Sequence, residues 1–186
     1  MVRGTDEQLS LGEWACLGIL YEGPSHGFAI AARLKPDGDI GRVWSLSRPL
    51  TYRSLDQLVH RGYVRAVGEE RGIAGGNRTI LAATRRGRAR LRSWLATPAP
   101  HVRDLRSELL LKLVIGERCA IDVSAMLDRQ RERIVAVIDA LADHPATDGA
   151  DVVTLWRQEL AEAALRFVDT VRAAPAARSG RNTAPA

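Results

Sequence analysis

A change in the spacing of apolar residues at Gly62 constrains the fold of this chain most. Before Gly62 the apolar residues recur at helical intervals, whereas after it two short runs, Tyr63–Val67 and Thr79–Ala83, have the composition of strands. The residues between these runs, 68–78, are rich in glycine and charge, which is typical of an exposed, mobile hairpin tip. The sequence therefore predicts a mainly α-helical protein with one small β-hairpin.

Three helices are predicted before this hairpin and one directly after it. The first follows a Ser10–Glu13 capping-box pattern, and its buried face would contain Leu11, Trp14, Leu17 and Tyr21. The second runs from His26 to Leu34 with Ser25 as its cap, and its buried face would contain Phe28, Ile30, Ala31 and Leu34. The third runs from about Ser47 to Arg61 and would be held on the core by Leu55, Leu58 and Val59; the fourth runs from Arg85 to Ala96. This order of elements predicts a winged helix-turn-helix, DNA-binding domain over residues 9–97.

A second, wholly helical part is predicted beyond Thr97–Pro100, a segment whose two prolines indicate a stiff hinge and a domain boundary. Three helices are predicted near 104–115, 120–142 and 151–173. The second has an apolar seam of Val123, Leu127, Gln130, Ile134, Val137 and Leu141, and the third has one of Val153, Trp156, Leu160, Ala163, Phe167 and Val171. Such seams fit helices packed side by side, within or between chains. Residues 101–173 are therefore predicted to form a helical dimerisation domain, and residues 174–186 a disordered tail.

Positive charge is concentrated in one part of the chain. Residues 42–92 hold twelve arginines against three acidic residues, a net charge of +9, whereas residues 101–173 hold ten basic and thirteen acidic residues, a net charge of −3. The first part should therefore attract a polyanion, and the second should not. Arginine suits phosphate groups, although its excess over lysine is equally expected of a GC-rich genome.

The candidate DNA contacts lie on the third helix and on the hairpin. In a winged helix-turn-helix the third helix lies in the major groove, while the hairpin reaches a flanking groove or the backbone. The side chains expected to bind DNA are Ser47, Arg48, Thr51, Tyr52 and Arg53 on the helix, and Arg71, Asn77 and Arg78 on the hairpin. Arginine forks onto guanine or phosphate, and hydroxyl groups suit phosphate oxygens. Each charge alone would be taken for a solvated surface group, but their convergence favours double-stranded DNA as the partner.

Three segments carry a resemblance to a known family. The stretch SRPLTYRSLDQLVHRGYV (47–64) looks like the recognition helix of the PadR family, Pro24–Ile30 resembles its His-Gly-aromatic opening of helix two, and Gly75–Gly87 resembles its wing and the start of its fourth helix. Residues 103–171 are similar to the long C-terminal helical domain of the family's virulence-activator-like branch. One departure is Thr79–Leu81, where the family often has an aromatic residue. The resemblance implies a homodimer that binds an operator, as a repressor or occasionally an activator, and is often released by a small aromatic effector.

Trp156 is the candidate contact for such an effector. It lies on the last predicted helix, where its ring could stack on a flat ligand in a pocket of the dimer. The simpler interpretation is that Trp156 fills the core of the dimer.

No catalytic residue, metal site or cofactor is predicted. The chain has no Gly-x-Ser-x-Gly elbow, glycine-rich phosphate loop or His-Glu-x-x-His motif, and its histidines lack metal-ligand spacing. Cys16 and Cys119 are expected to be buried free thiols. No apolar run is long enough for a membrane span, and the N-terminus lacks the apolar core of a signal peptide, so we expect a cytoplasmic protein without a membrane partner.

The function predicted from the sequence is that of a sequence-specific DNA-binding transcription regulator, acting as a homodimer on a pseudo-palindromic operator. The main alternative is a winged-helix adaptor whose basic face binds an acidic protein. An enzyme that acts on nucleic acid is a more distant third.

Overall fold

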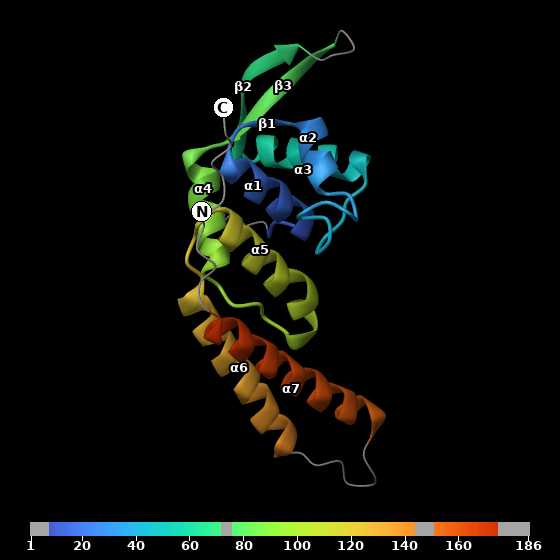
Figure 1. Ribbon diagram of the computed structural model, residues 1–186, viewed down its shortest axis with the longest axis vertical. Coiled ribbons are helices and arrows are strands. Elements are labelled where there is room, and N and C mark those ends of the chain that lie inside the picture. The colour runs from blue at the N-terminus through green and yellow to red at the C-terminus, as the bar shows by residue number, and fades with distance from the viewer. Residues whose placement is uncertain (1–7, 72–75, 144–150, 175–186) are drawn as a thin grey trace, which may run out of the picture.

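The computed structural model describes residues 8–71, 76–143 and 151–174 of the 186-residue chain. The N-terminal elements are α1 (Leu11–Glu22), β1 (Ser25–His26), α2 (Gly27–Arg33), α3 (Arg48–His60), β2 (Val64–Arg71), β3 (Asn77–Ala83) and α4 (Arg85–Leu95). The C-terminal elements are a 3₁₀ turn (Val102–Asp104), a π-helical turn (Leu105–Leu109), α5 (Leu110–Arg118), α6 (Ser124–Ala142) and α7 (Val152–Ala173). The molecule is elongated, with the hairpin at one end and the α6–α7 pair at the other (Figure 1). The predicted fold class, a mainly helical winged helix-turn-helix with further C-terminal helices, is confirmed.

Helix α1 forms the centre of the first hydrophobic core. The predicted capping box is present, since the backbone N–H of Ser10 donates to Glu13 Oε2 at 2.7 Å and that of Glu13 donates to Ser10 Oγ at 3.3 Å. Every residue of α1 from 12 to 20 is buried, not only one face, because helices α3, α4 and α5 all pack around it. The ring of Trp14, predicted on the buried face of this helix, stacks on the ring of Trp94 of α4 with centroids 4.6 Å apart.

The sheet has a strand that the sequence did not indicate. Ser25 and His26 form β1, which pairs antiparallel with β3 and gives the order β1-β3-β2. The expected cap at Ser25 is therefore wrong: His26 caps α2, with its Nδ1 accepting from the backbone N–H of Ala29 at 3.1 Å. A two-residue strand has no periodicity to detect, and only its partner strand defines it.

Two residues that were expected to be buried in the N-terminal part are exposed. Phe28 on α2 is 49% exposed, whereas Ile30, Ala31 and Leu34, the other three apolar residues predicted on this face, are buried. Val59 on α3 is 43% exposed, whereas Leu55 and Leu58 are buried and hold this helix on the core.

The segment Thr97–Pro100 is packed on both sides. Pro98 and Ala99 are buried, and the side chain of Gln130 on α6 accepts from the Ala99 N–H at 2.7 Å and donates to its carbonyl at 3.3 Å. Beyond this segment, the continuous helix expected near 104–115 is instead a 3₁₀ turn, a π-helical turn and then α5. The division of the chain into domains at 97 stays a prediction, although Leu111 and Ile115 of α5 belong to the first core.

Helices α6 and α7 form a pair that lies side by side at the far end of the molecule (Figure 1). A second core joins them to the linker, and its buried members are Ala99, Leu105, Leu109, Met126, Leu127, Ile134 and Val168. The tail predicted for 174–186 falls, from residue 175 on, outside the described residues. No helix among the described residues is both long and apolar enough to cross a membrane.

Candidate nucleic-acid interface

Helix α3 presents a polar face to solvent at the hairpin end of the molecule. Thr51, Leu55 and Leu58 are its buried residues, and Pro49 in its first turn fits there because the missing N–H would have no partner within the helix. The predicted contacts that lie exposed at the start of α3 are Ser47, Arg48, Tyr52 and Arg53, beside the exposed apolar residues Pro49 and Leu50. These four therefore face outward, as the sequence predicted.

Thr51 does not share this outward orientation. Its side chain is fully buried, and its Oγ1 donates to the carbonyl of Ser47 at 3.1 Å. The expectation that Thr51 faces outward is wrong, because it lies four residues before Leu55 and so on the same face of the helix. That spacing was visible in the sequence.

The hairpin projects from the core as a ribbon (Figure 1). In β2 only Val64 is buried, while every residue from 65 to 71 is exposed. Arg71 and Asn77 face each other in the antiparallel register, and the Asn77 amide donates to Glu69 Oε2 at 2.8 Å. Asn77 thus contributes to the hairpin itself. The predicted mobile tip includes residues 72–75, which lie outside the described residues.

Phe28 brings the helix and the hairpin together. The guanidinium carbon of Arg48 lies 5.2 Å from the centroid of the Phe28 ring, and that of Arg78 lies 5.4 Å from the same centroid. Arg48 also lies 5.9 Å from the centroid of Tyr52. The guanidinium groups of Arg48 on α3 and Arg78 on β3 therefore both lie close to Phe28, an exposed aromatic residue of α2 that was not among the predicted site residues.

Gly27 allows α2 and α3 to approach this closely. A Cβ atom at this position would lie 2.8 Å from Cε1 of the Tyr52 ring, closer than side-chain atoms ordinarily pack. The absence of a side chain at Gly27 therefore leaves room for the Tyr52 ring against the start of α2.

A network of ion pairs joins α1, α2 and α5 with Asp39, which follows α2. Arg33 on α2 donates to Glu22 at 2.7 Å and to Asp39 at 2.8 Å, and Arg118 on α5 contacts Glu22 at 2.9 Å and Asp39 at 2.8 Å. Burial opposes ionisation of Glu22, but hydrogen bonds from Arg118 and Arg33 outweigh it and lower the pKa of this carboxyl. Asp39 has a lowered pKa too, because Arg33 outweighs the same effect of burial. The network fixes α5 to the helix-turn-helix.

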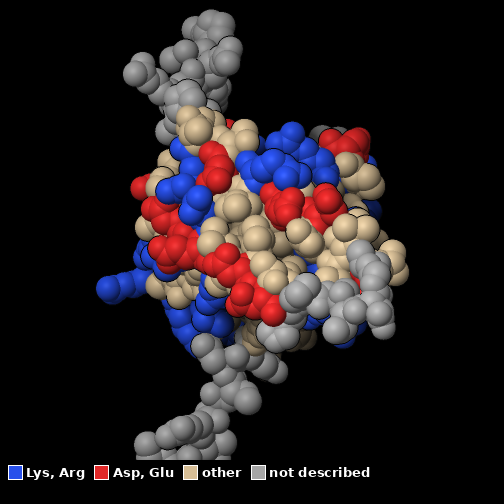
Figure 2. Space-filling model, turned by 90° about the horizontal axis from the view of Figure 1, so that it is seen from below, with Lys and Arg blue, Asp and Glu red and all other residues tan. Residues whose placement is uncertain are grey.

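Acidic side chains gather elsewhere on the surface. Seen from the end opposite the hairpin, they form a band that crosses the molecule, with basic and uncharged side chains around it (Figure 2). This view agrees with the net negative charge of residues 101–173. A polyanion is therefore expected to prefer the hairpin end.

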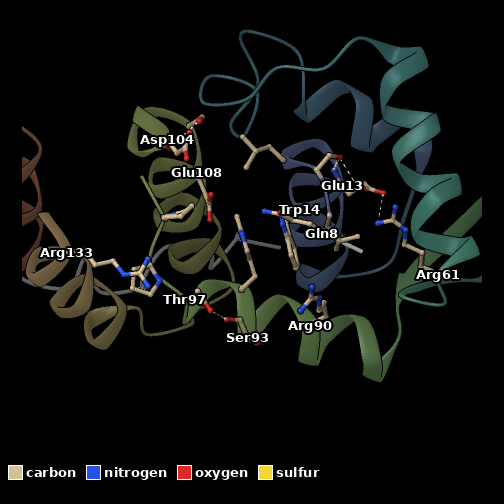
Figure 3. Close-up of a pocket in the computed structure, with 17 residues that line it drawn as sticks. Gln8, Glu13, Trp14, Arg61, Arg90, Ser93, Thr97, Asp104, Glu108 and Arg133 are labelled. Atoms are coloured by element: carbon tan, nitrogen blue, oxygen red, sulfur yellow. Dashed lines mark hydrogen bonds and ion pairs between the residues drawn. The ribbon is translucent and has the colours of Figure 1, made fainter. Parts of the chain in front are cut away.

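A cavity of about 870 Å³ lies between the start of α1, α4 and the linker (Figure 3). Its lining includes Trp14, Trp94, Glu13, Glu108 and Arg133. Aromatic rings beside groups of both charges suit an amphipathic molecule. Trp156, the residue proposed from the sequence to contact an effector, does not line this cavity; it lies on α7 with 64% of its surface exposed.

Comparison with known proteins gives structural neighbours only. No family model matches the chain, and no curated protein matches its sequence. Bacillus subtilis PadR in complex with operator DNA has 17% identity over 89% of this chain and 100% of its own, with a TM-score of 0.47. Bacillus subtilis PadR on its own has 16% identity over 91% and 97%, with a TM-score of 0.42. The protein smu.1604c from Streptococcus mutans has 17% identity over 88% and 99%, with a TM-score of 0.43.

Proposed function

We propose that this protein is a sequence-specific transcription regulator that binds double-stranded DNA through α3 and the hairpin. One observation carries the proposal: arginines of α3 and of β3 converge on one exposed face, with Arg48 and Arg78 within 5.4 Å of the same ring centroid. An α-helix fits the major groove, and a hairpin beside it reaches the neighbouring backbone. Ser47 and Tyr52 offer hydroxyl groups to phosphate oxygens, and Arg53 is exposed where it can reach a base edge. Arg71 and Asn77 extend this surface along the hairpin.

Selection from a random duplex library tests this function directly. We expect the full-length protein to enrich a pseudo-palindromic sequence and to bind it at least a thousandfold more tightly than a scrambled duplex at the same salt concentration. The affinity for the scrambled duplex should fall steeply with salt, since phosphate contacts release counterions. Binding to polyglutamate at the affinity of duplex DNA, with no sequence enriched, would instead support an adaptor for acidic proteins.

We further propose that a second copy of the chain covers the exposed apolar face of α7. Val153, Trp156 and Phe167 are 47%, 64% and 39% exposed, and with Leu160 and Ala163 they follow the three- and four-residue spacing of a packed seam. Val171, the last residue of the predicted seam, packs instead within the chain. An exposed apolar stripe of this length favours a protein interface, and a two-fold dimer would present two copies of α3 to successive major grooves, about 34–36 Å apart. Repression of a gene is the expected consequence of such binding over a promoter.

A small aromatic effector at Trp156 completes the proposal. If the α7 faces of two copies meet, the two Trp156 rings lie within the interface, where a flat ligand could stack. We expect such a ligand to quench the fluorescence of a variant that keeps Trp156 alone, with Trp14, Trp44 and Trp94 changed to Phe, and to release operator DNA. Release of DNA without quenching would place the effector elsewhere, and the cavity beside Trp94 would then be examined with a variant that keeps Trp94 alone.

A further inference from the structure

Phe28 is the one strongly exposed aromatic residue of α2, and its surroundings explain why exposure is tolerated. Its ring is 49% exposed, so it contributes little to the core. Two guanidinium groups flank it, from Arg48 at the first position of α3 and from Arg78 on β3. His26, which caps α2, lies 6.3 Å from it between ring centroids. The ring therefore contacts cations from two separate elements.

The backbone fixes both arginines relative to this ring. His26 of β1 pairs with Ile80 of β3. Arg78 lies two residues before Ile80, so the side chains of Arg78 and Ile80 project from the same face of β3. On the other side, the Tyr52 ring packs against Gly27, which holds the first turns of α3 beside Phe28. Arg48 and Arg78 therefore both lie beside Phe28 because β1 pairs with β3 and because α2 packs against α3.

The repulsion between the positive charges of Arg48 and Arg78 beside the Phe28 ring is fully compensated only when an anion binds between them. The face of an aromatic ring attracts each guanidinium, but this attraction at an exposed site is weak. The distance between the guanidinium carbons of Arg48 and Arg78 cannot exceed the sum of their distances to the Phe28 ring centroid. A phosphate group accepts hydrogen bonds from more than one guanidinium, and it is the anion that duplex DNA presents between a groove-bound helix and a flanking hairpin.

We propose that Phe28 is a positioning residue that holds Arg48 and Arg78 together as one joint site for a backbone phosphate of DNA. This inference rests on the proposed function and deepens it. It assigns Arg48 to the phosphate backbone of DNA, and so leaves Arg53 as the arginine of α3 that contacts a base edge. Helix α3 and the hairpin then bind the duplex as one unit.

Phe28→Leu, which removes the ring but keeps an apolar side chain, tests this assignment, with Phe28→Tyr as the variant that restores a ring. We expect Phe28→Leu to weaken binding to the selected operator and to a scrambled duplex alike, roughly three- to tenfold, and Phe28→Tyr to bind as the wild type does. The double variant Arg48→Ala with Arg78→Ala should lower the slope of log affinity against log salt by about one, and each single variant by less, because the two arginines share one phosphate; base preference should not change. In a background that lacks both arginines, Phe28→Leu should have no further effect. Arg103→Ala, which removes an arginine whose side chain is 77% exposed and lies 3.8 Å from Asp104 Oδ1, is the charge control.

NMR of the free protein tests the geometry without DNA. The ring current of Phe28 should displace the side-chain proton shifts of Arg48 and Arg78 in the wild type and in Phe28→Tyr, but not in Phe28→Leu. Equal shifts in all three would overturn the positioning role. A changed base preference in Arg48→Ala would overturn the phosphate assignment, whereas failure of the wild type to bind any duplex, with the ring-current shifts present, would reject the proposed function and leave the cluster intact.

Discussion

Thr51 and Arg53 lie two residues apart on α3 and have opposite surroundings. Thr51 is fully buried, whereas Arg53 is exposed. We expect Thr51→Val, which keeps the shape of the side chain, to leave operator affinity within about twofold, because the hydroxyl is buried and donates to the Ser47 carbonyl within its own helix. Arg53→Ala should cost about 1–3 kcal/mol of operator binding and blur the preference at one base pair.

Competition binding with operators that differ at single base pairs checks both variants, and thermal unfolding controls for their stability. A loss of base preference in Thr51→Val, equal to that in Arg53→Ala, would contradict the assigned orientation of α3.

These residues also show what sequence patterns can establish at this scale. Helical spacing correctly placed Arg48, Tyr52 and Arg53 outside, since Leu55 and Leu58 fix which face is buried. It failed for Phe28, because apolar character does not reveal that two arginines from distant parts of the chain would contact the ring. Contacts between elements lie beyond a local pattern.

The Glu22 network leads to a prediction about pH. The pKa of Glu22 and that of Asp39 are lowered in the folded protein, so their contribution to stability is present above the ordinary carboxyl pKa, about 4, and is lost as pH falls through the lowered values. We expect Arg118→Ala to lower the free energy of unfolding by about 1 kcal/mol at pH 7, since the network is partly exposed. This difference from the wild type should shrink below pH 4. Denaturant unfolding across this pH range measures it, and a difference that is independent of pH would exclude the carboxylates as its cause.

The linker between the two helical parts depends on contacts that no local pattern showed. Its prolines predicted a stiff hinge and a domain boundary, and that stays a prediction. The buried amide of Gln130 and the buried amine of Lys112, which donates to the Thr97 carbonyl at 2.6 Å, anchor the segment to α6 and α5. Helix limits were predicted within a few residues where caps and glycines mark them. The π-helical turn at Leu105–Leu109 was missed, because its residues have the spacing of an ordinary helix.

Gln130→Met is therefore expected to loosen the linker. The change keeps the length of the side chain but leaves the buried N–H and C=O of Ala99 without their partner, which should cost about 1–3 kcal/mol of stability. Hydrogen exchange should show faster exchange at the Ala99 amide in the variant than in the wild type. Unchanged protection of this amide would mean that the linker is held by its other contacts alone.

On the scale of the whole molecule, the proposed dimer depends on the exposed stripe of α7. Trp156→Glu places a charge in that stripe, whereas Gln158→Lys places one on the same helix away from it and serves as the matched control. The full chain is needed, because Leu111 and Ile115 of α5 complete the first core and a chain ending near Thr97 would lack them.

We expect Trp156→Glu to sediment as a monomer at micromolar concentration and to bind a full operator no more tightly than a half-site. The gain in affinity for a full operator requires two linked DNA-binding domains, because linkage raises the effective concentration of the second domain at its half-site. Gln158→Lys should remain a dimer and keep that gain. A wild-type chain that sediments as a monomer, or a Trp156→Glu variant that still prefers the full operator over a half-site, would show that α7 does not join the two copies.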